Sequence, residues 1–527
     1  MKIKYIVMAV ALLSAGQAAA QETYENAKIA GEDLNGTARY VGMGGALDAL
    51  GADLSTISSN PAGIGRFRKS KIEGTVGVVS QANAADYPHG DATKVSFDQL
   101  GGVWALRSLD GSSFLNVGFN YHKSRNFNLI LSADDQFGRS TSDGTLYASQ
   151  NKLTYMKLNN GLICPMDGEG RIYMEDAYIS CNQLDDIYVK NLLYAAGDGE
   201  RYFYEANNYD FDRAHKGYIG EYDFNISGNI NDRVYLGVTM GVHDVHYKHV
   251  GDYTEFILPN PEEIAKLNVY DEREITGQGV DVKLGAIVRP VEYAPLLLGA
   301  YVHTPTWYDL TTSNYTEVSD GKTTVWAEDS YDYKIYTPWK FGFSAGYTVG
   351  KQLALGAGFE YADYGNIKTR INDGGGYMFY EYYETSHNDE NMNEHTKLTL
   401  KGVSTVKVGA ELKVTPEIAL RAGYNFSTAM YNKNGFKDGS IQSNGSYIAS
   451  ATDYTNWKDT NRFTLGFGYS TGKINLDLAY QYSMVKGDFY PFMSYTDNKY
   501  YDFDNIANGV EVNNKRHQVM CTLGYSF

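Results

Sequence analysis

The most constraining feature of the chain is a two-residue alternation of apolar and polar side chains, repeated in segments of about ten residues. Near the C-terminus, Ile474, Leu476, Leu478, Tyr480 and Tyr482 alternate with Asn475, Asp477, Ala479, Gln481 and Ser483. Successive side chains of a β-strand point to opposite faces, so this strand has one apolar and one polar face. An aliphatic centre with tyrosines towards one end is typical of a strand between lipid and a polar lumen.

Fourteen such segments can be counted in the sequence. The connections between them alternate between short and long, the longest spans about 126–215, and the last strand ends on an aromatic residue, Phe527. An even strand count with short turns on one side and long loops on the other is typical of outer-membrane barrels. We therefore predict an all-β fold, a 14-stranded antiparallel transmembrane β-barrel over 70–527 with long extracellular loops. A large soluble all-β protein is the alternative. The predicted strands are approximately 70–83, 95–107, 112–125, 216–229, 232–247, 275–289, 294–304, 333–349, 352–364, 400–415, 417–431, 459–470, 473–486 and 512–527.

The first 20 residues predict a signal peptide and therefore export. Lys2 and Lys4 precede an apolar stretch that is too short to span a bilayer, and Ala18–Ala20 offers a small-residue cleavage site. The rest of the chain has no long apolar run, which excludes a helical membrane protein. A formal net charge of −17 makes a nucleic-acid partner unfavourable. Export together with a barrel places the chain in the outer membrane of a Gram-negative bacterium.

Cysteine is sparse. Cys164 and Cys181 lie in the longest predicted loop, and export permits a disulfide bond between them. The pair lacks the neighbouring His or Cys residues that a zinc site would need. We predict that this pair is oxidised, and that Cys521 in the last strand is unpaired.

Histidines 243, 246 and 249 are the one other group that suggests a metal. On a strand, a spacing of three places neighbouring side chains on opposite faces, so we predict no metal site. No Ser/His/Asp arrangement stands out in the sequence. We accordingly expect no enzymatic activity and no cofactor.

Residues 21–69 do not alternate and carry two motifs. Arg39 to Ala46 reads R-Y-V-G-M-G-G-A, and Asn60 to Gly63 reads N-P-A-G. Glycines permit close backbone packing, Asn60 can cap a turn, and Pro61 fixes the backbone after it. The two motifs resemble the start of the FadL/OMPP1/TodX family of outer-membrane transport proteins, where G-M-G-G-A and N-P-A-G lie inside an N-terminal hatch.

The resemblance implies that residues 21–69 form a hatch that plugs the barrel. It implies a channel for passive uptake of small hydrophobic molecules, such as long-chain fatty acids. The motif residues would lie in the transport path, with a rigid wedging turn as the alternative role: Gly42, Gly44, Gly45, Asn60, Pro61, Ala62 and Gly63. Sideways release of ligand is also implied. Gly118 in the third predicted strand is the candidate opening, because Gly weakens strand pairing.

The expected partners are a hydrophobic small-molecule ligand, outer-membrane lipids and lipopolysaccharide, and the outer-membrane barrel assembly machinery; no nucleic acid is expected. Two other functions stay open. One is a barrel component of a protein secretion or surface-attachment system. The other is a loop-mediated adhesin, whose aromatic side chains would bind a surface ligand or, equally, line a capture pocket: Tyr202, Phe203, Tyr204, Tyr209 and Phe211.

Overall fold

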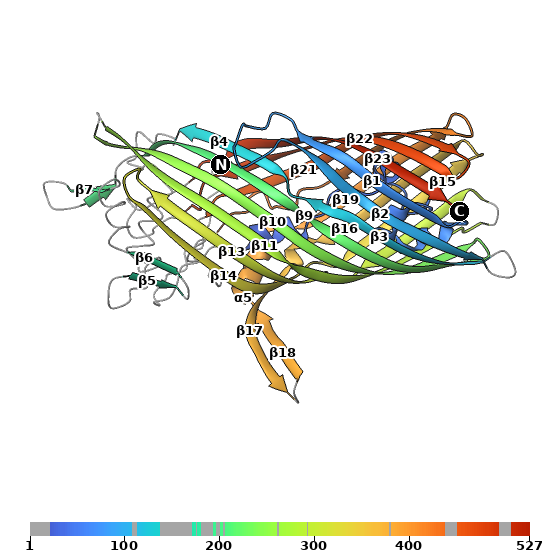
Figure 1. Ribbon diagram of the computed structural model, residues 1–527, viewed down its shortest axis with the longest axis horizontal. Helices are drawn as coiled ribbons and strands as arrows, with labels where there is room; N and C mark the ends of the chain where they lie inside the picture. The colour runs from blue at the N-terminus through green and yellow to red at the C-terminus, as the bar shows by residue number, and fades with distance from the viewer. Residues whose placement is uncertain are drawn as a thin grey trace, which may run out of the picture.

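The wall of the molecule is one closed antiparallel sheet (Figure 1). In this computed structural model β1 pairs with β2 on one side and with β23 on the other, so the sheet has no free edge. Some crossings of the wall are interrupted, and two consecutive strands then make one crossing: β3 with β4, β12 with β13, β14 with β15, β16 with β17, and β18 with β19. The wall therefore has fourteen crossings, as predicted. The described residues are 22–107, 113–136, 171–174, 177–180, 193–195, 201–203, 206–260, 263–291, 294–378, 381–437, 451–494 and 507–527.

The wall strands are β1 (Lys71–Gln81), β2 (Thr93–Arg107), β3 (Phe114–Asn126), β4 (Leu129–Gln136), β9 (Ala206–Ile230), β10 (Val234–Asn260), β11 (Glu263–Val288), β12 (Leu296–His303), β13 (Trp307–Ser319), β14 (Thr324–Tyr336), β15 (Lys340–Val349), β16 (Leu353–Asp363), β17 (Lys368–Met378), β18 (Glu381–Asn388), β19 (Gly402–Lys413), β20 (Ile418–Ser427), β21 (Tyr454–Thr471), β22 (Ile474–Tyr490) and β23 (Val510–Ser526). Two short hairpins lie outside this sheet: β5 (Arg171–Met174) with β6 (Ala177–Ser180), and β7 (Leu193–Ala195) with β8 (Arg201–Phe203).

The outer face of the wall carries the apolar stripe that the alternation predicts. On β22, Leu478 and Tyr480 are exposed, whereas Ala479 and Gln481 between them are buried. Large exposed apolar side chains recur in this way from strand to strand, which in water would be a strongly unfavourable surface. The face is the lipid-contacting surface of a transmembrane barrel.

Two predicted loops are instead continuations of the wall. Residues 248–260 and 263–274 pair as parts of β10 and β11, and β13 and β14 form a hairpin within the predicted loop 305–332. On β10 the outward residues change from apolar, ending at Val242, to polar, beginning at Asp244. Inward residues change in the opposite sense and become apolar at Val245. The prediction ended these strands too early because the apolar stripe faces the interior above the lipid.

The interrupted crossings differ in how they depart from the wall. β17 pairs with β14 over 368–371, and the β17–β18 hairpin then projects away from the barrel (Figure 1). Between β18 and β19 lies α5 (Glu390–Thr399), and between β16 and β17 lies η3 (Tyr364–Asn366). Among the residues that the structure describes, no helix combines the length and apolarity needed to cross a membrane.

Residues 22–69 fold inside the barrel and are nearly all buried. They form α1 (Thr23–Ala30), α2 (Ala38–Gly42), η1 (Leu54–Ile57) and η2 (Pro61–Arg66). Helix α2 lies against β20 to β23, whereas η2 lies against β3 and β9 to β11. The segment thus touches opposite sides of the wall, and we call it the N-terminal segment.

Candidate functional site in the barrel lumen

The first motif packs its backbone directly on the wall. Gly44 has a φ of +63°, which favours glycine, and a Cβ atom placed on it would lie 2.8 Å from the backbone nitrogen of Tyr424. A Cβ on Gly42 would lie 3.1 Å from the Cα of Gly466. The side chain of Asn425, on the wall, donates a hydrogen bond to the carbonyl oxygen of Gly44 at 3.3 Å. These glycines are required by close approach to the wall.

The wall also carries glycines where the N-terminal segment approaches it closely. A Cβ on Gly356 would lie 1.9 Å from the carbonyl oxygen of Ala46, and a Cβ on Gly409 would lie 2.2 Å from that of Met43. The sequence analysis did not single these residues out. A signal was present, since glycines weaken strands unless another backbone approaches closely. The wall glycines that approach the N-terminal segment in this way are Gly237, Gly285, Gly299, Gly346, Gly356, Gly409, Gly423 and Gly466.

The N-P-A-G motif forms a capped turn against β9. As predicted, Asn60 is an N-cap: its Oδ1 accepts from the Ala62 nitrogen at 3.2 Å, and Pro61 occupies the first position of η2. Asn60 Nδ2 donates to the carbonyl of Asp48 at 2.9 Å. The hydroxyl of Ser227 donates to the Pro61 carbonyl at 2.8 Å. Both the turn and its attachment to the wall therefore depend on this motif.

Charged side chains also join the N-terminal segment to the wall. Arg39 makes a two-point contact with Glu411, at 2.9 and 3.2 Å. Glu411 also accepts from Arg421 at 2.6 Å, and Arg421 donates to Asp477 at 2.7 Å. Glu411, Arg421 and Asp477 are all buried on the inner side of the wall. Such pairs orient the segment, since each buried charge has a hydrogen-bonded partner.

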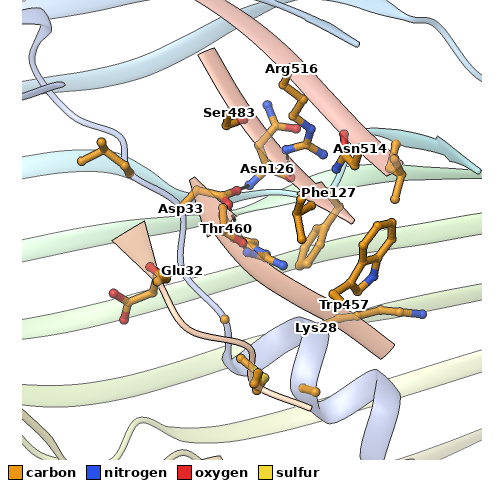
Figure 2. Close-up of a pocket in the computed structure, with 18 of the residues that line it drawn as sticks. Lys28, Glu32, Asp33, Asn126, Phe127, Trp457, Thr460, Ser483, Asn514 and Arg516 are labelled. Atoms are coloured by element: carbon orange, nitrogen blue, oxygen red, sulfur yellow. Dashed lines mark hydrogen bonds and ion pairs between the residues drawn. The ribbon is translucent and has the colours of Figure 1, made fainter. Parts of the chain in front are cut away.

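A cavity of about 290 Å³ lies at the other end of the N-terminal segment (Figure 2). Its walls come from α1 and the loop after it, from β3 and β4, and from β20 to β23. Aromatic and sulfur-containing side chains line part of it, including Phe127, Trp457 and Met430. The lining also carries the arginines Arg125 and Arg516. Further charged side chains of both signs complete the lining, so the cavity offers apolar and polar surface side by side.

Asp33 is the main anionic side chain beside these arginines. Its Oδ1 accepts from Arg125 at 3.0 Å, and its Oδ2 accepts from the backbone nitrogen of Asn126 at 2.9 Å. Burial acts to raise the pKa of Asp33, but the attraction of Arg125 and Arg516 and the hydrogen bond from Asn126 outweigh it and hold the pKa below its ordinary value. Asp33 is therefore a stable carboxylate that ties the loop after α1 to strand β3.

The wall beside the cavity lacks backbone pairing along part of the boundary between β2 and β3, which we call the seam, and β21 likewise has no β20 partner over 454–459. Pairing between β2 and β3 runs from Arg107–Phe114 to Gln99–His122 and stops there. Beyond His122, no described residue of β3 or β4 pairs with β2; both strands stay paired with β9. The chain breaks out of the sheet at residues 127–128, between the two strands. Gly118, predicted as the weak point, lies in β3 but is paired on both sides.

Side chains close this seam. Lys123 Nζ donates to Ser96 Oγ at 2.6 Å, and Asn35 Nδ2 donates to the Lys123 carbonyl at 2.9 Å. The side chain of Gln81 bonds both the nitrogen and the carbonyl of Ile130, at 2.8 and 2.7 Å. Side-chain hydrogen bonds can be broken by rotation of a rotamer, whereas a backbone ladder breaks only as a unit. Opening the seam therefore requires no backbone ladder between β2 and β3 to break.

Other residues from the sequence analysis fall in different places. Tyr209 and Phe211 point inward and are buried, against Tyr253 at 5.8 Å and Phe489 at 4.7 Å between ring centroids. That placement contradicts a role for these two rings on an adhesive surface. Nothing is described of the side chains of Tyr202, Phe203 and Tyr204. Cys164 and Cys181 lie outside the described residues, so their disulfide stays a prediction, and Cys521 is a free cysteine.

Comparison with known proteins bears on the fold. No protein-family model matches the chain, and no curated protein sequence matches it significantly. The crystal structure of a Pseudomonas aeruginosa FadL homologue matches over 94% of this chain and 99% of its own, with a TM-score of 0.50 and 12% identity. The chain has the fold of the FadL-type barrels. The resemblance that the two motifs indicated is therefore confirmed at the level of the fold.

Two other solved structures match the same share of this chain with lower scores. They are the toluene transporter TodX of Pseudomonas putida, at a TM-score of 0.46 and 12% identity, and the monoaromatic hydrocarbon channel CymD, at 0.47 and 11%. The match covers 99% of each of these chains.

Proposed function

We propose that the chain is an outer-membrane channel of a Gram-negative bacterium for passive uptake of small hydrophobic molecules. One observation carries this proposal: the lumen cavity lies directly beside the seam, where side chains and not backbone hydrogen bonds join β3 to β2. Lys123, Arg125, Asn126 and Phe127 line the cavity, and they belong to the stretch of wall that lacks a backbone partner in β2. A ligand in the cavity is thus separated from the lipid by side chains alone.

The N-terminal segment acts in this proposal as the hatch. Fourteen crossings enclose more space than the eight whose side chains fill their own interior, so the lumen needs a filling to block water and ions. The close backbone contacts of Gly44 and Ala46 with the wall support that role. N-P-A-G holds the hatch in place, and its docking to Ser227 supports a wedging turn more directly than a moving gate.

The ligand class follows from the cavity. Phe127, Trp457 and Met430 offer apolar contacts. Arg125 and Arg516 add positive charge to the lining, although Arg125 already donates to Asp33 and Arg516 to the Asn126 carbonyl. A long-chain fatty acid combines both requirements, an apolar chain and one carboxylate. The proposal extends to other hydrophobic cargo, of the kind carried by the toluene transporter TodX and the hydrocarbon channel CymD.

Cross-linking the seam tests the route. In a Cys521→Ser background, Ser96→Cys and Lys123→Cys would be joined by a short bismaleimide that contains a cleavable disulfide. Uptake of radiolabelled oleate and of toluene into cells that carry the barrel would be measured before joining, after joining and after reduction. We expect joining to reduce uptake to the background of cells without the protein, and reduction to restore it.

A matched pair on an intact seam controls for the cross-linker. Lys486 and Glu511 are exposed and 2.8 Å apart on β22 and β23, which pair without a register shift. Joining Lys486→Cys to Glu511→Cys should leave uptake unchanged. Full uptake with the 96–123 pair joined would exclude the seam as the route, and loss of oleate uptake alone would assign the fatty acid as the cargo.

A further inference from the structure

A second polar cluster lies away from the cavity, on the inner face where β3, β9, β10 and β11 run side by side. It contains three carboxylates, Glu221, Asp223 and Asp281, and one ammonium, Lys283. Two imidazoles, His122 and His243, complete it, and every member is more than nine-tenths buried. As predicted from spacing, His243 points inward and His246 outward. The register of the barrel brings the inward histidine to the acids.

Lys283 holds one side of the carboxylates and leaves the other side free. Its Nζ contacts Oε1 of Glu221, lies 2.9 Å from Oδ1 of Asp223, and lies 3.7 Å from Oδ1 of Asp281. The second oxygens face the imidazole of His243. Glu221 Oε2 lies 3.7 Å from its Nδ1, and Asp281 Oδ2 lies 3.5 Å from its Nε2. Among the described residues, no group closer than the 3.5 Å contact with Asp281 satisfies either ring nitrogen of His243.

The two carboxylates lie beside different ring nitrogens, so an ion bound through one nitrogen takes the nearer carboxylate directly and the other after a side-chain rotation. A zinc ion with bonds of about 2.0–2.2 Å places its ligand atoms roughly 3.3–3.5 Å apart. The ligand atoms of Glu221, His243 and Asp281 all lie within 4.8 Å of one another. A His with two carboxylates is a normal donor set for such an ion, and a further protein or solvent ligand completes four-coordination.

The net charge of the cluster also favours a bound cation. With neutral imidazoles, three carboxylates and one ammonium leave a net charge of −2 among buried groups. Buried charge without compensation is strongly unfavourable. The next cation along the wall, Lys340, is paired with Glu32 at 2.5 Å and does not supply the balance. One divalent cation, or one proton on each imidazole, would balance it.

We propose that Glu221, His243 and Asp281 bind one divalent transition-metal ion of the zinc type. Lys283 orients two of these ligands from behind, in the way that outer partners orient metal ligands. A second trio, His122, Glu221 and Asp223, shares Glu221 but is already bonded to the N-terminal segment. Ser58 Oγ donates to Asp223 at 2.6 Å and lies 3.2 Å from His122 Nδ1. The metal therefore sits on the wall side of the contact between wall and N-terminal segment.

Metal content of the purified full-length barrel tests this assignment. The protein, without a polyhistidine tag, would be refolded in detergent with ZnCl₂ or CoCl₂ and freed of loosely bound ion on a chelating column. Elemental analysis should then find about one zinc per chain. The cobalt form should show the visible absorption of a low-coordinate site with nitrogen and oxygen ligands.

The chain supplies a matched control on the same strand. His246 is exposed on the outer face, 2.9 Å from Asp244. This pair is therefore a His beside a carboxylate that lies outside the buried cluster. We expect His243→Gln and Asp281→Asn to lower bound zinc at least tenfold and His246→Gln to leave it unchanged. Heat-modifiable migration on gels would show that each variant is folded, and Glu221→Gln gives a third ligand variant.

Two results would overturn the proposal. Wild-type protein that retains no zinc would mean that protons balance the cluster. Folded His243→Gln and Asp281→Asn variants that retain as much zinc as wild type would place the bound ion elsewhere on the protein.

Discussion

The two ends of the N-terminal segment meet the barrel in opposite ways. Residues 38–66 contact the wall backbone to backbone, through glycines on both sides, with Gly44 against Tyr424 and Ala46 against Gly356. Residues 24–35 meet the wall mostly through side chains, with one backbone hydrogen bond from the Asp33 nitrogen to the Ser124 carbonyl at 2.9 Å, and leave a cavity of about 290 Å³. Packing at the first end has no room for an added methyl group, whereas the second end has room for a ligand.

This difference suggests that one end fixes the N-terminal segment in the lumen and the other end binds and releases the ligand. A contact between two backbones cannot be relieved by a side-chain rotation, so the glycine end fixes the position of the segment in the lumen. Side chains such as Lys123 and Asn35 can change rotamer, so the other end can open towards the lipid without moving the segment as a whole. Substitutions at the two ends should therefore have effects of different kinds.

The largest effect is expected at the glycine end. Gly356→Ala places a methyl group 1.9 Å from the Ala46 carbonyl, and overpacking of this kind costs about 1–3 kcal/mol, here at the upper end because backbone blocks the way. We expect the N-terminal segment to become sensitive to added protease while the barrel keeps its heat-modifiable migration.

Gly358→Ala is the control for this substitution. Gly358 lies two residues further along β16 and faces the same side, but a methyl group placed on it would have its nearest neighbouring atoms 3.6 Å away. The N-terminal segment of this variant should stay protease-resistant. Equal sensitivity of the two variants would show that close approach to the backbone is not what holds the segment.

A smaller effect is expected at the N-P-A-G turn. Asn60→Ala removes the cap of η2, and the loss of an N-cap costs about 1 kcal/mol. Pro61→Ala frees the backbone that presents its carbonyl to Ser227. Both variants should assemble normally and take up hydrophobic ligand more slowly in the radiolabel assay. Unchanged uptake in both would show that the position of this turn does not affect the passage of ligand.

At the cavity end the effect should fall on ligand alone. Trp457→Ala removes an aromatic ring from the cavity lining. We expect the affinity for a fluorescent fatty acid to weaken roughly fivefold, about 1 kcal/mol, with protease resistance of the N-terminal segment unchanged. Loss of resistance instead would show that the cavity end also holds the segment, and the contrast between the two ends would fail.

The smallest effect is expected from pH. The pKa of Asp33 is held below its ordinary value of 3.8, so its contribution to holding the loop after α1 is complete above that value. It is lost only as the pH falls through the lower pKa of the folded protein. Protease resistance should therefore be constant from pH 5 to 8 as far as Asp33 is concerned. A loss within that range would assign the contact to another group.

Much of the wall could be predicted from the sequence because lipid imposes one rule on every strand. Outward residues such as Leu478 and Tyr480 are apolar, and the count of fourteen follows from repeats of that pattern. Outward residues need to be apolar only where the strand contacts lipid. On β10 the outward Asp244 and His246 are polar and the inward Val245 and Tyr247 are apolar, so the pattern of the upper wall does not predict a lipid-facing strand.

The candidate site was only partly predictable. Asn60, Pro61 and the glycines of the first motif are contiguous, and local chemistry predicts their turn. The seam is different, because pairing between β2 and β3 stops at His122 for reasons that involve Asn35 and Arg516 from distant parts of the chain. Gly118 is paired on both sides, so its role as the opening stays a prediction. The cluster around Glu221 likewise depends on strand register, which no local pattern gives.

The central claim is that the N-terminal segment closes the lumen, and electrical recording in planar bilayers tests it most directly. A variant that lacks residues 21–69 would be compared with the full chain after heat-modifiable migration has shown that both barrels are folded. Because fourteen crossings approach the sixteen that leave an aqueous channel, the shortened barrel should give stable, ion-conducting pores and the full chain should give none. Equal conductance of the two proteins would contradict the account, since the lumen would then be open, or closed, without the segment.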